Sequence, residues 1–227
     1  MYHHVSAVES TDLTIGARRL EEQFKWLNEN NFRTWHFSEL EKLTQLPSGK
    51  NVIITFDDAY ISFKELALPL LKKYNLKATL FVPLEFPGKT DEWYSGQNPI
   101  MTSTELKSLD PSLVELGYHS FAHKKYHQMS PAEIKEDLDK CREIIKAENF
   151  NFYPALAYPY GKYPRDKSAK GQFIKYLEGE GFIFGLRIGN RLNSFPFKNP
   201  FEIQRLDIKG EYDLSKFKRK IKFGKLL

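Results

Sequence analysis

The chain has 227 residues, a formal net charge of +5 and 41% hydrophobic residues. This length and apolar content suit one domain with a sizeable core, since the sequence shows no Pro/Gly/Ser-rich linker, internal repeat or low-complexity block. We therefore expect a single domain over residues 1–227. The one cysteine, Cys141, excludes a disulfide within the chain, and its helical spacing from Ile134 and Leu138 is typical of core packing.

The start of the sequence carries neither a basic segment nor an apolar run of the kind found in secretory signals. No stretch approaches the roughly 20 apolar residues that span a bilayer. We therefore expect a cytoplasmic protein without a signal peptide or transmembrane segment, although a leader that had been removed would leave the same sequence.

Strand-like and helix-like patterns alternate along the chain. This alternation favours a largely parallel sheet or a barrel. In chain order the patterns predict a strand at 2–5, a helix at 20–28, a strand at 51–56, a helix at 61–74, a strand at 77–82, helices opened by capping boxes at 102–105 and 130–133, and strands at 153–157, 182–188 and 203–208.

Basic residues gather late in the chain, at 216–225, where they alternate with apolar ones. Asp213 is suited to cap a terminal helix, and Leu214, Phe217 and Ile221 follow at the spacing of a buried face. We expect a solvated basic face and no nucleic-acid partner, because no nucleic-acid motif accompanies the run. Peripheral contact with an anionic membrane surface stays open.

The most informative feature is a pair of carboxylates, Asp57 and Asp58, at the end of the apolar run 52–54. About sixty residues later His119 and His123 stand four apart. One Asp and two His make a three-ligand metal set that leaves a position open for water, while the other Asp can act as a base. Taken separately, the Asp pair also suits a turn or helix cap, and the His pair a surface helix. A third motif, Ala-Tyr-Pro-Tyr-Gly at 157–161, closes another short strand.

With these motifs in this order, the chain resembles the polysaccharide deacetylase family, the NodB-homology domains of carbohydrate esterase family 4. The resemblance implies a distorted (β/α) barrel and the metal-dependent hydrolysis of acetyl groups, usually from N-acetylated sugars. The segments that carry the resemblance are 2–5, 55–58, 67–74, 77–82, 119–123 and 158–161.

The family resemblance also implies the roles of particular residues. Asp57 matches the general base, and Asp58, His119 and His123 match the ligands of one divalent metal ion. Zinc is the expected metal, with cobalt, nickel and iron as alternatives. The family takes an oxyanion donor from the backbone N–H after the motif proline, which is Tyr160 here.

The sequence departs from the family pattern at two positions. Many members carry an arginine that orients the base, but Ala157 stands in its place; Arg205 is our candidate for a replacement, and a surface ion-pair partner is the alternative. The usual late histidine, which protonates the leaving group, is also missing, because all six histidines precede residue 128. A branch of the family that resembles a circular permutation opens with Tyr-His and uses that histidine as the acid. This match assigns the acid to His3, and strand alternation then turns His4 to the opposite face.

The remaining aromatic and histidine candidates are weaker. Trp93 lies in the turn-rich segment 86–99 and is a candidate to stack on a sugar ring, with core packing as the alternative. His36 and His127 are not expected in the site.

We therefore expect a deacetylase that acts on a glycan partner: an N-acetylated sugar, in a nucleotide-linked or lipid-linked precursor or an oligosaccharide. The alternatives are a hydrolase of another small linear or cyclic amide on the same fold, and a catalytically silent glycan-binding module. The sequence leaves open which sugar is used, whether the acetyl group is N- or O-linked, and the oligomeric state.

Overall fold

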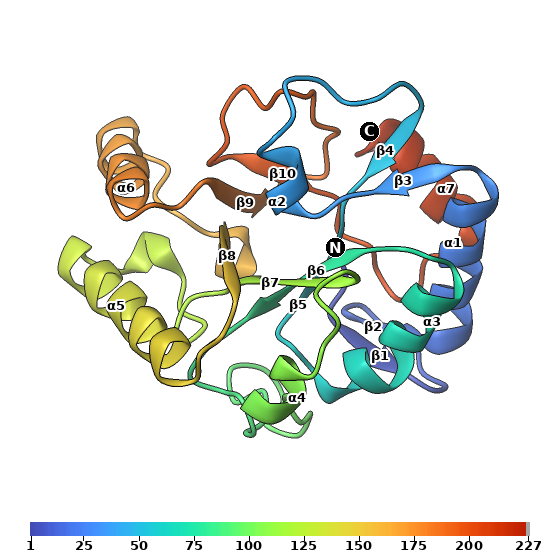
Figure 1. Cartoon of the computed structure of the whole chain (residues 1–227), viewed down its shortest axis with the longest axis horizontal. Helices are drawn as coiled ribbons and strands as arrows, with labels where there is room; N and C mark the ends of the chain where they lie inside the picture. The colour runs from blue at the N-terminus through green and yellow to red at the C-terminus, as the bar shows by residue number, and fades with distance from the viewer. Residues whose placement is uncertain (226–227) are drawn as a thin grey trace.

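The computed structural model describes residues 1–225, which form an α/β fold around one curled parallel sheet (Figure 1). The six strands lie in the spatial order β10-β9-β8-β7-β6-β5. All neighbouring pairs are parallel, so the carboxyl ends of the strands meet at one mouth of the sheet. The strands are β5 (Ile54–Asp57), β6 (Ala78–Val82), β7 (Val114–Tyr118), β8 (Phe152–Ala157), β9 (Phe184–Ile188) and β10 (Ile203–Arg205).

The first residues of the chain lie between β5 and the segment that follows β10. The Tyr2 N–H donates to the carbonyl of Thr55 at 2.9 Å, and the Asp57 N–H donates to the carbonyl of Tyr2 at 3.0 Å. On the other side, the Ile208 N–H donates to the carbonyl of Met1 at 3.2 Å. These bonds join the two edges of the curled sheet, so the predicted distorted barrel is confirmed.

Two small parallel sheets complete the strands, and they correct two predicted elements. The strand predicted at 51–56 is wrong as a single element: β4 (Lys50–Val52) pairs with β3 (Phe32–Thr34), whereas β5 pairs with β6. The chain changes partner at Ile53. The strand predicted at 2–5 is displaced, because β1 (His4–Ser6) pairs with β2 (Thr14–Gly16), while Tyr2 bridges to Phe56.

Most helices lie around the outer side of the sheet, whereas the short helix α2 lies within the ring of strands (Figure 1). Both predicted capping boxes are present, at Thr102 and Ser130, and Asp213 caps the last helix as expected. The α-helices are α1 (Ala17–Glu29), α2 (Phe37–Leu40), α3 (Leu68–Lys73), α4 (Ser103–Lys107), α5 (Pro131–Ala147), α6 (Lys167–Gly179) and α7 (Leu214–Phe223).

The helix predicted at 61–74 is interrupted. A π-helical turn, η1 (Phe63–Ala67), precedes α3. Pro69 lies in the first turn of α3, and a proline has no N–H to continue the preceding hydrogen-bond register. The shift from the π-helical to the α-helical hydrogen-bond pattern therefore lies next to Pro69, the residue without a backbone N–H.

Several elements were not predicted, and β7 is the most important because it leads to His119. A buried acidic residue at its second position, Glu115, hides the strand pattern. The carboxylate of Glu115 is satisfied by the backbone N–H groups of Phe37 and Ser38, at 2.9 and 3.0 Å, at the start of α2. Helix α6, capped by Asp166, and the short elements α2, β2 and β3 were also not predicted.

The core between the sheet and the helices is rich in aromatic rings. Tyr2 stacks on Phe56 at a centroid distance of 5.2 Å, and Trp26 of α1 meets Phe217 of α7 edge to face. Cys141 is fully buried, which confirms its predicted place in the core. Among the described residues, no helix is both long enough and apolar enough to span a membrane.

Candidate metal centre and active site

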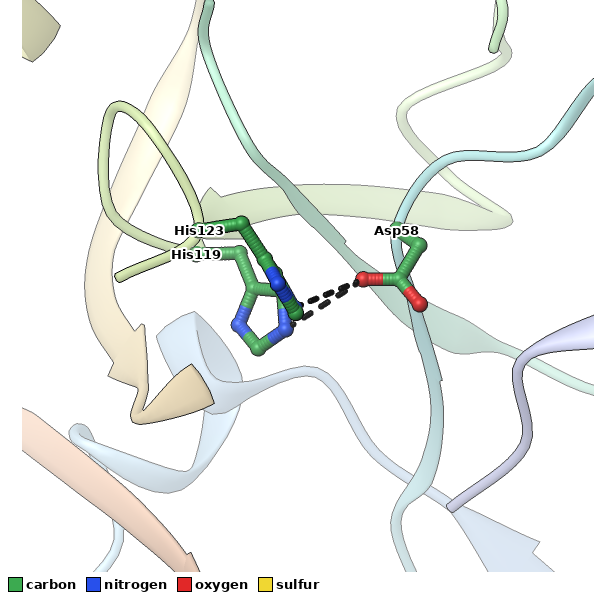
Figure 2. A group of neighbouring side chains, drawn as sticks. All are labelled: Asp58, His119 and His123. Atoms are coloured by element: carbon green, nitrogen blue, oxygen red, sulfur yellow. Dashed lines mark ion pairs between the residues drawn. The ribbon is translucent and has the colours of Figure 1, made fainter. Parts of the chain in front are cut away.

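Asp58, His119 and His123 lie together just beyond the carboxyl ends of β5 and β7 (Figure 2). The Oδ1 atom of Asp58 is 3.5 Å from Nε2 of His119 and 3.2 Å from Nε2 of His123. All three side chains are buried. The three donor atoms therefore converge on one point inside the barrel mouth.

The geometry of this cluster fits a divalent metal ion. Asp58 Oδ1 is buried and has no hydrogen-bond partner among the described residues, although two imidazole nitrogens face it. Ligand atoms about 2.0–2.2 Å from a tetrahedral zinc ion would lie roughly 3.3–3.6 Å apart, close to the two observed separations. Two imidazoles and one carboxylate are also a common donor set for a catalytic metal with an open position.

His119 is held in the protonation state that a metal ligand needs. Its Nδ1 lies 2.8 Å from the carbonyl of Ala157, and a carbonyl oxygen only accepts, so Nδ1 carries the hydrogen and Nε2 presents its lone pair. Burial lowers the pKa of His119 to about 4, against the opposing charge of Asp57. The ring is therefore neutral at pH 7. Ala157, where many family members have an arginine, contributes its backbone to the site.

The backbone around the cluster is strained. Asp58, Ser120, His123 and Tyr160 have φ angles of 74°, 62°, 53° and 57°. These values lie in the left-handed region, where residues with a Cβ are uncommon. Such conformations persist only where surrounding contacts enforce them, and they gather at functional sites.

Asp57 and Arg205 form a buried ion pair next to the cluster. Nη1 and Nη2 of Arg205 donate to Oδ1 and Oδ2 of Asp57 at 2.5 and 2.8 Å, and the two residues are 5% and 2% exposed. Burial alone would raise the pKa of Asp57, but the charge of Arg205 and its hydrogen bonds hold that pKa well below its ordinary value. Asp57 is therefore ionised, and its Oδ2 lies 3.8 Å from Nε2 of His119.

The two N-terminal histidines meet different neighbours. Nε2 of His3 lies 3.9 Å from Oδ2 of Asp57, so His3 is at the barrel mouth. His4 packs edge to face against Tyr60, and its Nδ1 is 3.4 Å from the Thr14 hydroxyl. Of the two, only His3 reaches the carboxylates of the site.

Both predicted substrate-contact residues lie against His123. The Trp93 ring centroid is 4.4 Å from that of His123, and the Tyr160 ring centroid is 4.8 Å from it. Tyr160 is 40% exposed, and Lys125 lies 4.6 Å over its ring. Trp93 is half-buried and also packs on Phe86. The mouth therefore has an aromatic wall.

The excluded histidines lie outside this site. Nε2 of His36 lies 3.2 Å from the carbonyl of Leu113, and His36 is the N-cap of helix α2. His127 is exposed on the 3-10 turn η2 (Tyr126–Gln128).

Two residues that support the site were not predicted from the sequence. Asp91 is fully buried and accepts from the backbone N–H groups of Gln97 and Asn98, which orders the loop that carries Trp93. Asp137 contacts the loop between His119 and His123.

The curled parallel sheet and the Asp-His-His cluster at its mouth are those of a hydrolase with an α/β fold and a candidate metal site among the described residues. The family model for polysaccharide deacetylases matches residues 44–176, which include Asp57, Asp58, His119 and His123. The chain belongs to the polysaccharide deacetylase family.

Named relatives and solved structures agree with this family. The chain is 28% identical to YxkH of Bacillus subtilis (strain 168) over 189 residues, which cover 82% of this chain and 62% of that protein. It is 25% identical to the poly-beta-1,6-N-acetyl-D-glucosamine N-deacetylase of Staphylococcus aureus (strain MSSA476) over 223 residues, 93% of this chain and 73% of that protein.

Two solved structures share the fold across almost the whole chain. The deacetylase PplD of Streptococcus pyogenes, in complex with acetate, has a TM-score of 0.79 at 22% identity and covers 97% of this chain and 96% of its own. IcaB from Ammonifex degensii has a TM-score of 0.73 at 20% identity, with coverage of 92% and 90%.

Proposed function

We propose that the chain is a metal-dependent deacetylase that hydrolyses the acetyl group of an N-acetylated sugar. The observation that carries this proposal is the ionised carboxylate of Asp57, clamped by Arg205, with its Oδ2 3.8 Å from the neutral ring of His119. A base and a three-ligand centre side by side are what amide hydrolysis by an activated water requires.

Asp58, His119 and His123 would hold one divalent cation, for which we propose zinc on the basis of the two imidazole donors. When bound, the cation supplies Lewis-acid polarisation and lowers the pKa of water. Asp57 would receive the proton that the attacking water loses as the new C–O bond forms. Because the pKa of Asp57 is low, the carboxylate is ionised at neutral pH and gives up the accepted proton afterwards; as a weak base it would depend on the acidity that the cation confers on water.

We assign the leaving-group proton to His3, which lies 3.9 Å from Asp57 at the same mouth. As the C–N bond breaks, the departing amine needs a proton, and an imidazolium can provide it near neutral pH. The backbone N–H of Tyr160 would donate to the developing oxyanion, and the Tyr160 and Trp93 rings would contact the sugar. The positions of the two rings against His123 support the proposed contact with the sugar.

The proposed substrate class is a β-linked or precursor N-acetylated glycan. The name of the Staphylococcus aureus relative supports N-acetylglucosamine units, and 73% of that protein is covered. Nucleotide-linked, lipid-linked and oligosaccharide forms are the candidate substrates for this chain. The match to YxkH covers 62% of the length of that protein. The intact set of Asp57, Asp58, His119 and His123 favours this function over a silent glycan-binding module.

We also propose that the surface around α7 contacts an anionic membrane. Arg219, Lys222 and Lys225 are exposed there, and Phe223 is 56% exposed beside them. Lys225 donates its N–H to the carbonyl of Asn190, which brings Leu192, 53% exposed, to the same end of the helix. Exposed apolar side chains among lysines suit the headgroup region of anionic lipids.

The decisive experiment for the function combines acetate release with metal analysis. The purified protein is assayed on nucleotide-linked, lipid-linked and oligomeric N-acetyl sugars, next to a double variant with His119→Ala and His123→Ala. We expect release of acetate by the wild type, and loss of both metal and acetate release in the variant. His127→Ala, on an exposed histidine outside the site, is the matched control and should behave as the wild type.

Sugar binding without acetate release from any of these substrates would favour the silent glycan-binding module. Release of a different product from small linear or cyclic amides would favour the second alternative. An unchanged metal content in the double variant would refute the proposed ligands.

A further inference from the structure

We infer that Asp137, on helix α5, is a positioning residue for the metal centre: its buried carboxylate fixes the loop that presents His119 and His123. The inference rests on the proposed metal site. Asp137 does not touch the cluster itself, so its effect must pass through the backbone between the two histidines.

The contacts of Asp137 converge on that loop. Its Oδ1 and Oδ2 each accept from the Phe121 N–H at 3.1 Å, and Oδ1 also lies 3.4 Å from the Ala122 N–H. Oδ2 accepts from the Tyr126 hydroxyl at 3.0 Å. Asp137 is 6% exposed, so water competes little for these bonds. One side chain thus binds the loop between the ligands and the turn just after His123.

The loop needs such a clamp because its own conformation is unfavourable. Ser120 and His123 both have left-handed φ angles, and they flank the two amides that Asp137 binds. A free loop of this sequence would leave those conformations, and His123 would turn away from Asp58. Hydrogen bonds to a charged acceptor are also stronger than those to a neutral one.

A carboxylate is required for chemical reasons as well as for its shape. All three groups that face Asp137 are donors, and an ionised carboxylate offers only acceptors. The amide of asparagine has the same shape, but the Phe121 N–H lies 3.1 Å from both carboxylate oxygens, so the NH₂ group would face this donor in either orientation of the amide. Asp137→Asn therefore removes part of the clamp without opening a cavity.

The fold provides a matched control in Glu115 on β7. Glu115 is 8% exposed and also accepts from two consecutive backbone N–H groups, of Phe37 and Ser38, and from a hydroxyl, that of Thr79. It performs this task away from the barrel mouth, at the start of α2. A purely structural role for Asp137 would make Asp137→Asn and Glu115→Gln equivalent in every measurement.

The test is a competition titration of the metal-free protein with zinc and a chromophoric chelator, together with thermal unfolding of each metal-free variant. We expect Asp137→Asn to weaken zinc affinity by about ten- to a hundred-fold, as supporting residues of metal ligands do. Glu115→Gln should lower the melting temperature without changing zinc affinity. Tyr126→Phe removes only one hydroxyl and should weaken zinc affinity by a smaller factor, so it tests the same clamp if Asp137→Asn does not fold.

The absorption bands of the cobalt-substituted protein give a second readout, independent of turnover. We expect their intensity or position to change in Asp137→Asn and to stay constant in Glu115→Gln. Wild-type zinc affinity in Asp137→Asn and Tyr126→Phe, when His119→Ala abolishes binding, would overturn this inference alone. Zinc bound equally well by His119→Ala would instead overturn the proposed metal site.

Discussion

Arg205 and Asp57, 148 residues apart in the sequence, are joined by two parallel hydrogen bonds inside the barrel mouth. The pairing brings the end of β10 to the end of β5, across the line where the sheet closes. A planar guanidinium can hold both carboxylate oxygens at once, which an ammonium cannot. We propose that Arg205 takes the orienting role that the sequence leaves open at Ala157, on a different strand.

Replacing Arg205 should reveal this clamp. Arg205→Lys keeps the charge but loses the two-bond geometry, and we expect acetate release to fall by tenfold or more with metal content unchanged. Arg205→Ala leaves the carboxylate of Asp57 buried without a partner, which should cost about 3–5 kcal/mol of stability. Chemical denaturation and metal analysis measure these effects. Arg187→Lys, on the neighbouring strand β9, is the control, and equal losses in both lysine variants would contradict the special role of Arg205.

The two adjacent aspartates should separate in their effects. Asp57→Asn keeps the three ligands, so we expect full metal content with turnover reduced by about 10²–10⁴-fold, the usual contribution of a general base. Asp58→Asn replaces a ligand and should weaken metal binding as well. Metal content and acetate release, measured on both variants, decide the matter. Equal loss of metal in the two variants would contradict the division of roles.

The N-terminal histidines provide a second paired comparison. His3→Ala should lower the turnover number strongly while leaving the Michaelis constant and the metal content almost unchanged, because the acid acts only as the C–N bond breaks. His4→Ala should have little effect on turnover, since His4 packs on Tyr60 away from the carboxylates. Steady-state kinetics of both variants provide the test. Unchanged turnover after removal of both histidines would send the search for the acid elsewhere.

The stability of the metal-free protein should depend on pH through His119. Its folded pKa of about 4 lies below the ordinary 6.5, so between these values the unfolded chain binds a proton that the folded protein does not. Stability is therefore lost as pH falls from about 6.5 to about 4, by about 3 kcal/mol from this group. Chemical denaturation across this pH range, with a chelator present to keep the protein metal-free, measures the free energy of unfolding. This free energy should depend less on pH in His119→Gln than in the wild type. An identical pH dependence in the two proteins would rule out this contribution.

Contact with anionic membranes should depend on the end of α7. We expect the protein to sediment with vesicles that contain phosphatidylglycerol, less so at high salt, and hardly with neutral vesicles. Charge reversal by Arg219→Glu and Lys222→Glu should reduce binding by tenfold or more, at about 1 kcal/mol for each basic residue near the surface. Lys167→Glu with Lys175→Glu, on the exposed face of α6, is the matched control. Binding that survives the α7 changes would exclude this surface.

The sequence predicted the elements whose signals are local. Capping boxes at Thr102 and Ser130 depend on residues three apart, and both helices begin where expected. The strand before His119 was missed because Glu115 looks like a surface residue until α2 supplies its N–H donors. The break at Ile53 was also missed, since the change of strand partner depends on β3, which is distant in the sequence.

The same distinction applies to the site. The residues to which we assign the chemistry stand in short motifs, so Asp57, Asp58, His119 and His123 could be named from the sequence alone. Asp137 and Asp91 act through backbone amides of other segments, and nothing in their own helix or loop pattern indicates those partners. From the sequence, Arg205 could be either a partner of the base or a member of a surface ion pair. Its buried contact with Asp57 excludes the surface ion pair.

Met1 and Tyr2 join β5 to the segment after β10 by hydrogen bonds, and we expect activity to depend on these bonds staying closed. His3, Asp57 and Arg205 all lie along this closure, across which Met1 and Tyr2 make the backbone hydrogen bonds. A brief separation of the two edges would move the base, its arginine and the acid apart together, while the rest of the barrel stays folded. Hydrogen exchange at the Tyr2 and Asp57 amides would report that opening, and conditions that speed this exchange would silence the enzyme well below its melting temperature.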